Sequence, residues 1–202
     1  MITSFIEHIK QKTLCFDGAT GTMTQKLGLD DSRYGGPDFK MLVDMLCFST
    51  PDAVRDIHLA FYRAGADAVE TNTFGASPLR LGEYDFSKLE TGAFAAPPDG
   101  IELHTAAITD FTYHLNYRAA TLAREAQNQY RNEKGYDGRF LYVAGSIGPS
   151  NYVISATNAN LRHADFDRVS ENFYQQCLGL IDGGVDVLLF ETQQDILELK
   201  AG

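Results

Sequence analysis

The sequence predicts an α/β fold in which helices alternate with buried parallel strands. Two segments that nearly copy each other, residues 65–71 and 184–192, support this prediction most strongly. In each, a glycine ends a helical pattern, an apolar run follows, and Glu-Thr closes the run. An apolar run entered from a helix is typical of a strand buried on both faces of a parallel sheet. The two glutamates should therefore lie where parallel strands end, which is where such folds carry their chemistry.

The first expected unit combines a short helix, a short strand and a long connection. Ser4 and Glu7 form a capping-box pattern for a helix whose apolar side we expect at the floor of the fold. Residues 14–16 are a short apolar run and predict a strand. Residues 17–22, with two glycines and two threonines, predict a tight polar turn. Residues 23–49 should form a long loop that could cover a site.

The second expected unit begins with a helix that has one buried face. Thr50 and Pro51 suit an N-cap and a first helical residue, and apolar residues then recur three and four apart. Gly65 should end this helix. A strand is expected at residues 66–69, and the polar cluster at residues 70–75 should lie at its exit.

Two further units complete the alternation of strands and helices. Phe166, Val169, Phe173 and Leu180 share the side of one helix that we expect to be buried. In order, the pattern predicts a surface loop at about 85–100, a long helix at 104–133, a strand at 140–144 with a polar exit at 145–151, a helix from Asp165 to Gly184, a strand at 185–190 and a final helix capped by Asp195.

Composition limits the class of protein. A chain of 202 residues with 44% apolar content can form one domain with a real core. The net charge of -10 argues against nucleic acid or an anionic membrane as a partner. Three cysteines without metal-type spacing fit a reducing, cytoplasmic setting. The first 14 residues carry scattered charges, so we expect neither a signal peptide nor a membrane span there.

The pattern alone leaves two architectures open, an open parallel sheet and a closed barrel. The first strand is not followed by a G-x-G-x-x-G loop, which weakens the nucleotide-binding open sheet. A barrel of this class needs eight strand-helix units, and this chain uses its length on four. Strands one and four of such a half would have unpaired edges, which predicts aggregation or pairing with another copy.

Four ordered motifs resemble the homocysteine S-methyltransferase family: residues 16–22 (FDGATGT), 70–76 (ETNTFGA), 145–149 (GSIGP) and 190–192 (FET) with Asp195. Within that family they are most similar to the N-terminal, homocysteine-binding module of cobalamin-dependent methionine synthases. The resemblance implies a (β/α)8 TIM-type barrel, of which this chain carries about the first four βα units as a single, incomplete domain. It also implies methyl transfer to the homocysteine sulfur to give methionine, with zinc activating the thiol and a cobalamin or other methyl-donor domain as partner.

The resemblance further implies where homocysteine binds. Asp17 and Glu191 match family acids that lie around the amino-acid substrate, and a fixed carboxylate suits an ammonium group. Glycines in the first turn would let backbone N–H groups approach the substrate carboxylate. No catalytic residue and no metal ligand is expected in this chain, and the expected substrate-binding residues are Asp17, Gly18, Thr20, Gly21, Glu70, Asn72, Thr73, Ser146, Glu191 and Thr192.

Several of these residues also have a purely structural interpretation. Asp17 before a glycine can be a turn former, and Asp195 can be a helix cap. Glu70 can pair with a neighbouring loop and hold the rim together. Asn72 and Thr73 can form the turn or wall the pocket. An ionised carboxylate at the end of a buried strand is costly unless something pairs with it, so Glu191 is the firmest functional prediction.

Zinc is where the chain departs from the family. By the resemblance, the zinc ligands are three cysteines in the second half of the barrel, and none of that segment lies within residues 1–202. Cys15, Cys47 and Cys177 are expected to be small buried residues rather than ligands. The five histidines have no partner at ligand spacing and should be structural or solvated. We therefore expect the chain alone to be inactive until the C-terminal half of the barrel completes it.

The sequence leaves two functions other than a methyltransferase to consider. One is a zinc-independent protein that binds an amino acid or a partner without catalysis. The other is a lyase that uses a lysine Schiff base, which the sequence disfavours because no lysine falls at an expected strand exit. The methyl donor, whether folate, betaine or S-methylmethionine, is not encoded in the motifs of this chain.

Overall fold

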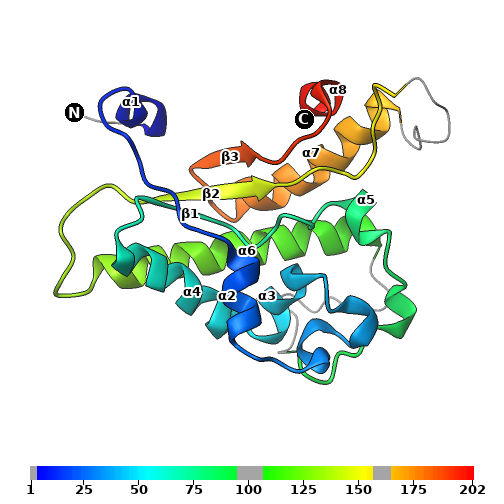
Figure 1. Ribbon diagram of the computed structural model, residues 1–202, viewed down its shortest axis with the longest axis horizontal. Coiled ribbons are helices and arrows are strands. Elements are labelled where there is room, and N and C mark those ends of the chain that lie inside the picture. The colour runs from blue at the N-terminus through cyan, green and yellow to red at the C-terminus, as the bar shows by residue number, and fades with distance from the viewer. Residues whose placement is uncertain (1–3, 95–106, 157–164) are drawn as a thin grey trace.

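The computed structural model describes residues 4–94, 107–156 and 165–202 and has a parallel sheet at its centre (Figure 1). Within these residues the sheet has three strands in the order β1-β2-β3, all parallel. Glu70 lies beside Ala144, and Ile147 lies beside Phe190. The predicted α/β class with parallel strands is confirmed, and the strands are β1 (Ala68–Glu70), β2 (Tyr142–Ile147) and β3 (Val187–Phe190).

The expected first strand is reduced to a single parallel bridge between Phe16 and Ala68. The Asp17 N–H donates to the Ala68 carbonyl at 3.0 Å, and the Asp67 N–H donates to the Cys15 carbonyl at 2.7 Å. The pairing stops there because the chain turns at Gly18 and enters a helix at Thr20. The prediction of a full strand at residues 14–16 was therefore wrong in extent, although the segment occupies the edge position.

Strand boundaries also differ from the prediction at the other two units. β2 continues through Gly145, Ser146 and Ile147, which the sequence placed in a polar exit loop. A Cβ added at Gly145 would lie 3.0 Å from Leu180, so the missing side chain lets α7 pack closely on the strand. β3 starts later than expected, at Val187. Just before it, the Asp186 N–H donates to the Val143 carbonyl and the Asp186 carboxylate accepts the Val143 N–H, both at 2.8 Å.

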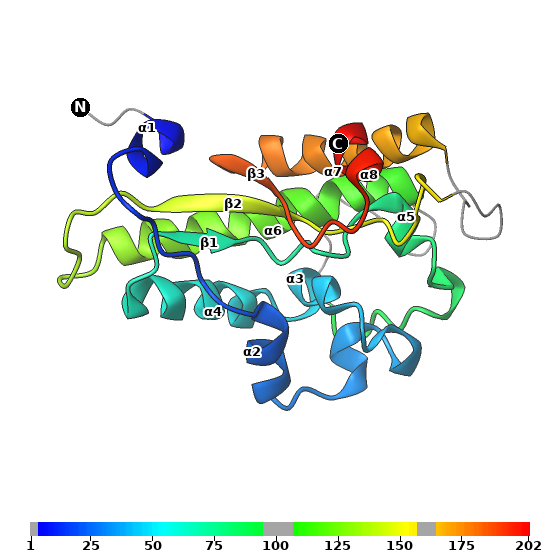
Figure 2. The same cartoon turned by 45° about the horizontal axis from the view of Figure 1, so that its top comes forward.

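Three long helices lie side by side against the sheet, with α6 between α4 and α7 (Figures 1 and 2). Pro51 occupies the first turn of α4 and Gly65 ends it with a φ of 110°, as predicted. On α7, Phe173 and Leu180 are buried, whereas Phe166 in the first turn is 44% exposed and corrects the expectation that it faces inward. The helices are α4 (Pro51–Ala64), α6 (Ile108–Arg131) and α7 (Phe166–Asp182).

The connection between residues 20 and 49 is not the tight turn and open loop that the sequence predicted. It folds into short helices whose apolar side chains, including Phe39, Met45 and Leu46, are fully buried with Leu81 and Leu115. This hydrophobic cluster packs the connection against α6. Its elements are α2 (Thr20–Lys26), η1 (Asp31–Tyr34), η2 (Pro37–Phe39), η3 (Val43–Met45) and α3 (Leu46–Ser49), followed after β1 by α5 (Pro78–Leu81) and η4 (Phe86–Lys88).

The two terminal helices lie at opposite ends of the strands (Figure 1). α1 (Phe5–Ile9) is capped by Ser4, whose hydroxyl accepts the Glu7 N–H at 3.3 Å. His8 hydrogen-bonds the Tyr142 hydroxyl at 3.1 Å, which places α1 at the amino-terminal ends of the strands, as the barrel-floor prediction requires. On the apolar side of α1, Ile6 is 54% exposed and Ile9 is 46% exposed.

α8 (Ile196–Ala201) follows the last strand and begins at Asp195, as predicted. The Asp195 carboxylate accepts the Leu197 N–H at 2.9 Å and the Ser155 N–H at 2.8 Å. Ile196 is 72% exposed. Within the described part of the chain, none of the helices combines the length and apolarity needed to cross a membrane. Residues 95–106, which include parts of the predicted loop and long helix, lie outside the described residues.

Candidate functional site

A pocket of about 440 Å³ lies at the carboxyl-terminal ends of the strands. Nine of the ten predicted substrate-binding residues line it, and Thr192 is the exception among the described residues. Residues from the first turn, β1, β2 and β3 meet there because parallel strands end at the same side of the sheet. The described lining consists of Asp17, Gly18, Ala19, Thr20, Gly21, Val43, Glu70, Thr71, Asn72, Thr73, Phe74, Ser146 and Glu191.

Asp17 ties the first turn to the end of β1. Both of its carboxylate oxygens accept the Glu70 N–H, each at 3.1 Å. Burial raises the pKa of Asp17 to about 7, against the lowering effect of the Glu70 N–H, and the negative charge of Glu191 raises it further. The residue thus has a structural role in the turn, while its carboxylate still faces the pocket.

Glu191 follows the last residue of β3 and is held by two contacts. Its backbone N–H donates to the Ile147 carbonyl at 3.1 Å, and its carboxylate accepts the Ser146 hydroxyl at 2.5 Å. Ser146 comes from the neighbouring strand β2, so the two expected site residues are brought into direct contact. This pairing fixes the direction of the Glu191 side chain into the pocket.

Glu70 lies beside both other acids. Burial raises its pKa to about 8, and the negative charges of Glu191 and Asp17 raise it further. Of the described residues that line the pocket, none is Lys, Arg or His. The site therefore gathers three carboxyl groups without a compensating cation, an arrangement that favours a positively charged ligand group.

The polar side chains after β1 mainly hold the wall of the pocket together. The Thr71 and Thr73 hydroxyls lie 2.6 Å apart, and Thr73 donates to the Ser146 carbonyl at 2.7 Å. The Asn72 amide donates to the Val43 carbonyl at 2.9 Å. Asn72 and Thr73 therefore line the pocket, and their hydrogen bonds also fix the turn. The two roles that the sequence left open, forming the turn and walling the pocket, thus both apply to them.

The glycines of the first turn are not required by packing. A Cβ added at Gly21 would meet nothing within 4 Å, and one at Gly18 would lie at an ordinary 3.4 Å from the Phe61 ring. Neither residue has a positive φ. Their small size leaves space on the pocket side, which is where a ligand would need close access to the backbone.

Sequence reasoning missed four residues of the described lining, Ala19, Val43, Thr71 and Phe74, and the nearby residue Asp44. Asp44 is buried and accepts the Gly75 N–H at 3.1 Å, and burial raises its pKa to about 6. It holds the loop that carries Phe74, an aromatic residue that lines the pocket and packs closely over Gly148. Phe74 belonged to a quoted motif and could have been included, whereas Asp44 gave no signal within a stretch that looked like a loop.

Thr192 lies just outside the pocket and has an unusual backbone. Its φ of 55° is in the left-handed region, which is costly for a β-branched residue. The Thr192 side chain is exposed. Its predicted role in substrate binding has no support from this position.

A zinc site cannot be built from the residues in view. No group of three or more His, Cys, Asp or Glu residues in the described part of the chain is arranged to hold a metal ion. Cys47 is buried, and burial raises the pKa of its thiol to about 12. Cys177 is half-buried, whereas Cys15 is exposed and corrects the expectation that all three are buried. Cys15 is exposed because it lies on the sheet edge, where the first segment pairs on one side only.

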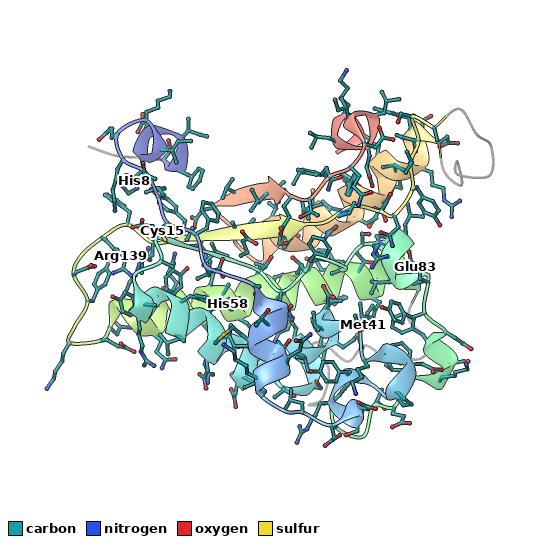
Figure 3. All side chains as sticks on the ribbon, in the orientation of Figure 1. His8, Cys15, Met41, His58, Glu83 and Arg139 are labelled. Atoms are coloured by element: carbon teal, nitrogen blue, oxygen red, sulfur yellow. The ribbon has the colours of Figure 1, made fainter. Side chains whose placement is uncertain are left out.

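None of the described histidines lines the pocket. His58 is fully buried on α4, and its ring nitrogens lack a hydrogen-bond partner, so burial lowers its pKa to about 4. Figure 3 shows His8, Cys15 and Arg139 toward the amino-terminal ends of the strands, away from the pocket. His104 and His163 lie outside the described residues. The described lining of the pocket also lacks a lysine, so nothing there supports a Schiff-base lyase.

A parallel α/β fold with an acidic pocket at its strand exits is the class that the fold and site define. Residues 14–202 match the homocysteine S-methyltransferase family. The chain belongs to this family. Because the match covers nearly all of the chain, the predicted family is confirmed.

Known relatives agree with this assignment. The chain is 32% identical over 201 residues to methionine synthase from Mycobacterium tuberculosis and to that from Mycobacterium leprae, covering 98% of this chain and 14% of each relative. The similarity is to the N-terminal region of methionine synthase. The chain thus spans only a small part of the length of these relatives.

Solved structures show the same fold. The metallated form of the homocysteine methyltransferase MmuM from Escherichia coli matches with a TM-score of 0.67 at 23% identity, over 96% of this chain and 59% of that chain. The apo form matches with a TM-score of 0.60 at 26% identity, over 96% and 54%. The three-stranded sheet and its helices correspond to about half of that TIM barrel.

Proposed function

We propose that this chain is the homocysteine-binding, N-terminal half of a methyltransferase barrel that makes methionine. The observation that supports this most is the pocket at the strand exits, where Asp17, Glu70 and Glu191 gather without a basic residue in the described lining. An ammonium group is the part of an amino acid that such a cluster would bind. The backbone beside Gly18 and Gly21 is the proposed site for the substrate carboxylate.

The same proposal assigns the methyl-transfer chemistry to the complete protein. In the family zinc prepares the thiol for attack, but the residues described here do not fit a zinc site, so the ligands must come from elsewhere. We propose the second half of the barrel as that source, and a cobalamin or other methyl-donor domain as a partner, in the cytoplasm. Residues 1–202 would bind and orient homocysteine and would be inactive alone.

A binding experiment tests this function directly. L-homocysteine is titrated into the 202-residue chain by calorimetry, beside 4-mercaptobutanoate, which keeps the thiol and the carboxylate but lacks the amino group. We expect saturable binding of homocysteine and at least about tenfold weaker binding of the analogue, because a charge-assisted hydrogen bond contributes about 1.5–3 kcal/mol. Equal affinity for the two ligands would contradict an acidic ammonium site.

A second function is also compatible with the structure, because the pocket is formed although the described residues contain no group of side chains arranged to hold a metal ion. This is a zinc-independent protein that binds an amino acid without catalysis. Co-expression with a C-terminal barrel half from a relative separates the two functions. Recovery of methyl transfer to homocysteine supports the methyltransferase, and metal-free binding without any recovery supports the binding protein.

A further inference from the structure

The three acids of the pocket differ in what holds them. Asp17 accepts the Glu70 N–H, and Glu191 accepts the Ser146 hydroxyl. Glu70 lines the same pocket and lies close enough to Glu191 for a carboxyl–carboxyl hydrogen bond. Ionised carboxylates only accept hydrogen bonds, so a hydrogen bond between two of them needs a proton on one.

The surroundings of the Glu70–Glu191 pair favour keeping that proton. Asp17 approaches from the first turn and brings a third carboxyl group. Ser146 from β2 donates to Glu191, and the other polar side chains of the described lining are those of Thr20, Thr71, Asn72 and Thr73. Basic side chains are absent from the described lining, and two neighbouring half-buried carboxylates resist simultaneous ionisation.

We propose that Glu70 and Glu191 share one proton in the ligand-free protein, and that the ammonium group of the substrate replaces this proton on binding. The proton leaves to solvent, and the ammonium N–H groups then donate to the two carboxylates. This inference rests on the proposed binding of homocysteine at the pocket. It adds that binding exchanges one positive charge for another, so the charge of the pocket stays nearly constant.

The exchange has a consequence for ligand choice. A ligand without a positive charge at this position leaves the proton in place and gains no ionic contact. Affinity for an ammonium ligand rises with pH, because the fraction of molecules whose Glu70–Glu191 pair still holds a proton falls, and fewer protons must be displaced on binding. The pocket thereby selects amino acids over the corresponding thiol acids, and does so more strongly at pH 8 than at pH 6.

Proton release is measured by calorimetry of the 202-residue chain at pH 7 in buffers of different ionisation enthalpy. The ligands are L-homocysteine and L-methionine, since methionine has no thiol proton to release. We expect about one proton released per ligand bound. Glu70→Gln should release markedly fewer protons than the wild type, because its amide donates to Glu191 and occupies the place of the proton. Glu171→Gln, an exposed change on α7, should match the wild type.

A second measurement needs no ligand. Carboxyl carbons of the ligand-free chain are followed by NMR as the pH is raised, and the Glu70 signal should titrate near pH 8 and move toward pH 4.5 in Glu191→Gln. Normal titration of Glu70 overturns the shared proton. Binding without proton release overturns the exchange but leaves the proposed function intact, whereas failure of both ligands to bind overturns the proposed function itself.

Discussion

The two near-identical segments that end in Glu70-Thr71 and Glu191-Thr192 become different structures. In the first, Thr71 is buried and its hydroxyl accepts the Ser146 N–H at 3.0 Å. In the second, Thr192 is exposed and has a left-handed backbone. The difference follows from neighbours: β1 lies between the Phe16 bridge and β2, whereas within the described residues β3 pairs with β2 alone.

The aspartates that precede these two strands show the same contrast. Asp67 accepts the Cys15 N–H at 2.9 Å, and Asp186 accepts the Val143 N–H at 2.8 Å, so each carboxylate extends the pairing to the preceding strand. The Asp67 side chain is 5% exposed, and that of Asp186 is 29% exposed. An aspartate thus makes the same carboxylate-to-backbone hydrogen bond before both strands. The burial of the carboxylate decides how much that hydrogen bond contributes to the stability of the protein.

The largest expected effect separates these two aspartates. Asp67→Ala should lower the free energy of unfolding by about 2–3 kcal/mol, because it leaves the Cys15 N–H without its charged acceptor. Asp186→Ala should cost about 1 kcal/mol, because the Asp186 carboxylate is 29% exposed and solvent weakens its contacts, whereas that of Asp67 is 5% exposed. Urea unfolding of both variants measures the two costs. Equal costs would show that burial does not set the difference.

The threonines give the next contrast. Thr71→Val removes the acceptor of the Ser146 N–H in a buried position and should cost about 1–2 kcal/mol. Thr192→Val changes an exposed side chain and should cost less than about 0.5 kcal/mol. Thermal unfolding followed by circular dichroism compares the pair. A similar loss in both variants would contradict the role given to the neighbouring strands.

A change at Thr192 should also be able to stabilise the protein. Thr192→Gly removes the Cβ from a residue with φ of 55° and should raise the free energy of unfolding by up to about 1 kcal/mol. Thr71→Gly is the matched control and should destabilise. A loss of stability in Thr192→Gly would show that the left-handed conformation carries no strain.

A separate expected effect is a pH slope that comes from the acids of the site. Folding raises the pKa of Asp17 from 3.8 to about 7 and that of Glu70 from 4.5 to about 8. Between about pH 4 and 8 the folded state therefore holds more protons than the unfolded state, so stability falls as pH rises through this window. Glu70→Gln should flatten the slope in urea melts at pH 5 and pH 8, and an unchanged slope would place its origin elsewhere.

Sequence reasoning found the parts of the fold that repeat. Strand positions and the location of Glu70 and Glu191 at the strand exits were predictable because a glycine, an apolar run and an acid recur in order. Residues 20–49 were not, since Phe39, Met45 and Leu46 follow no helical or strand period and are buried through contacts distant in sequence.

The environment of single residues was harder to predict than their position. The Cys15 exposure and the Thr192 backbone depend on which strand lies alongside, and a sequence pattern does not state that. Asp44 entered the site through a loop hydrogen bond to Gly75 that no spacing rule describes. The roles of the pocket residues in binding homocysteine stay predictions that experiments must test.

The most direct test of the acidic pocket is a cycle that removes the two halves of one ionic contact separately. Affinities of L-homocysteine and 4-mercaptobutanoate are measured for the wild type and for Glu191→Gln, with Glu171→Gln as the exposed control. We predict that the preference for homocysteine, at least about tenfold in the wild type and the control, falls to a few-fold or less in Glu191→Gln. A preference that survives unchanged in Glu191→Gln would contradict the account.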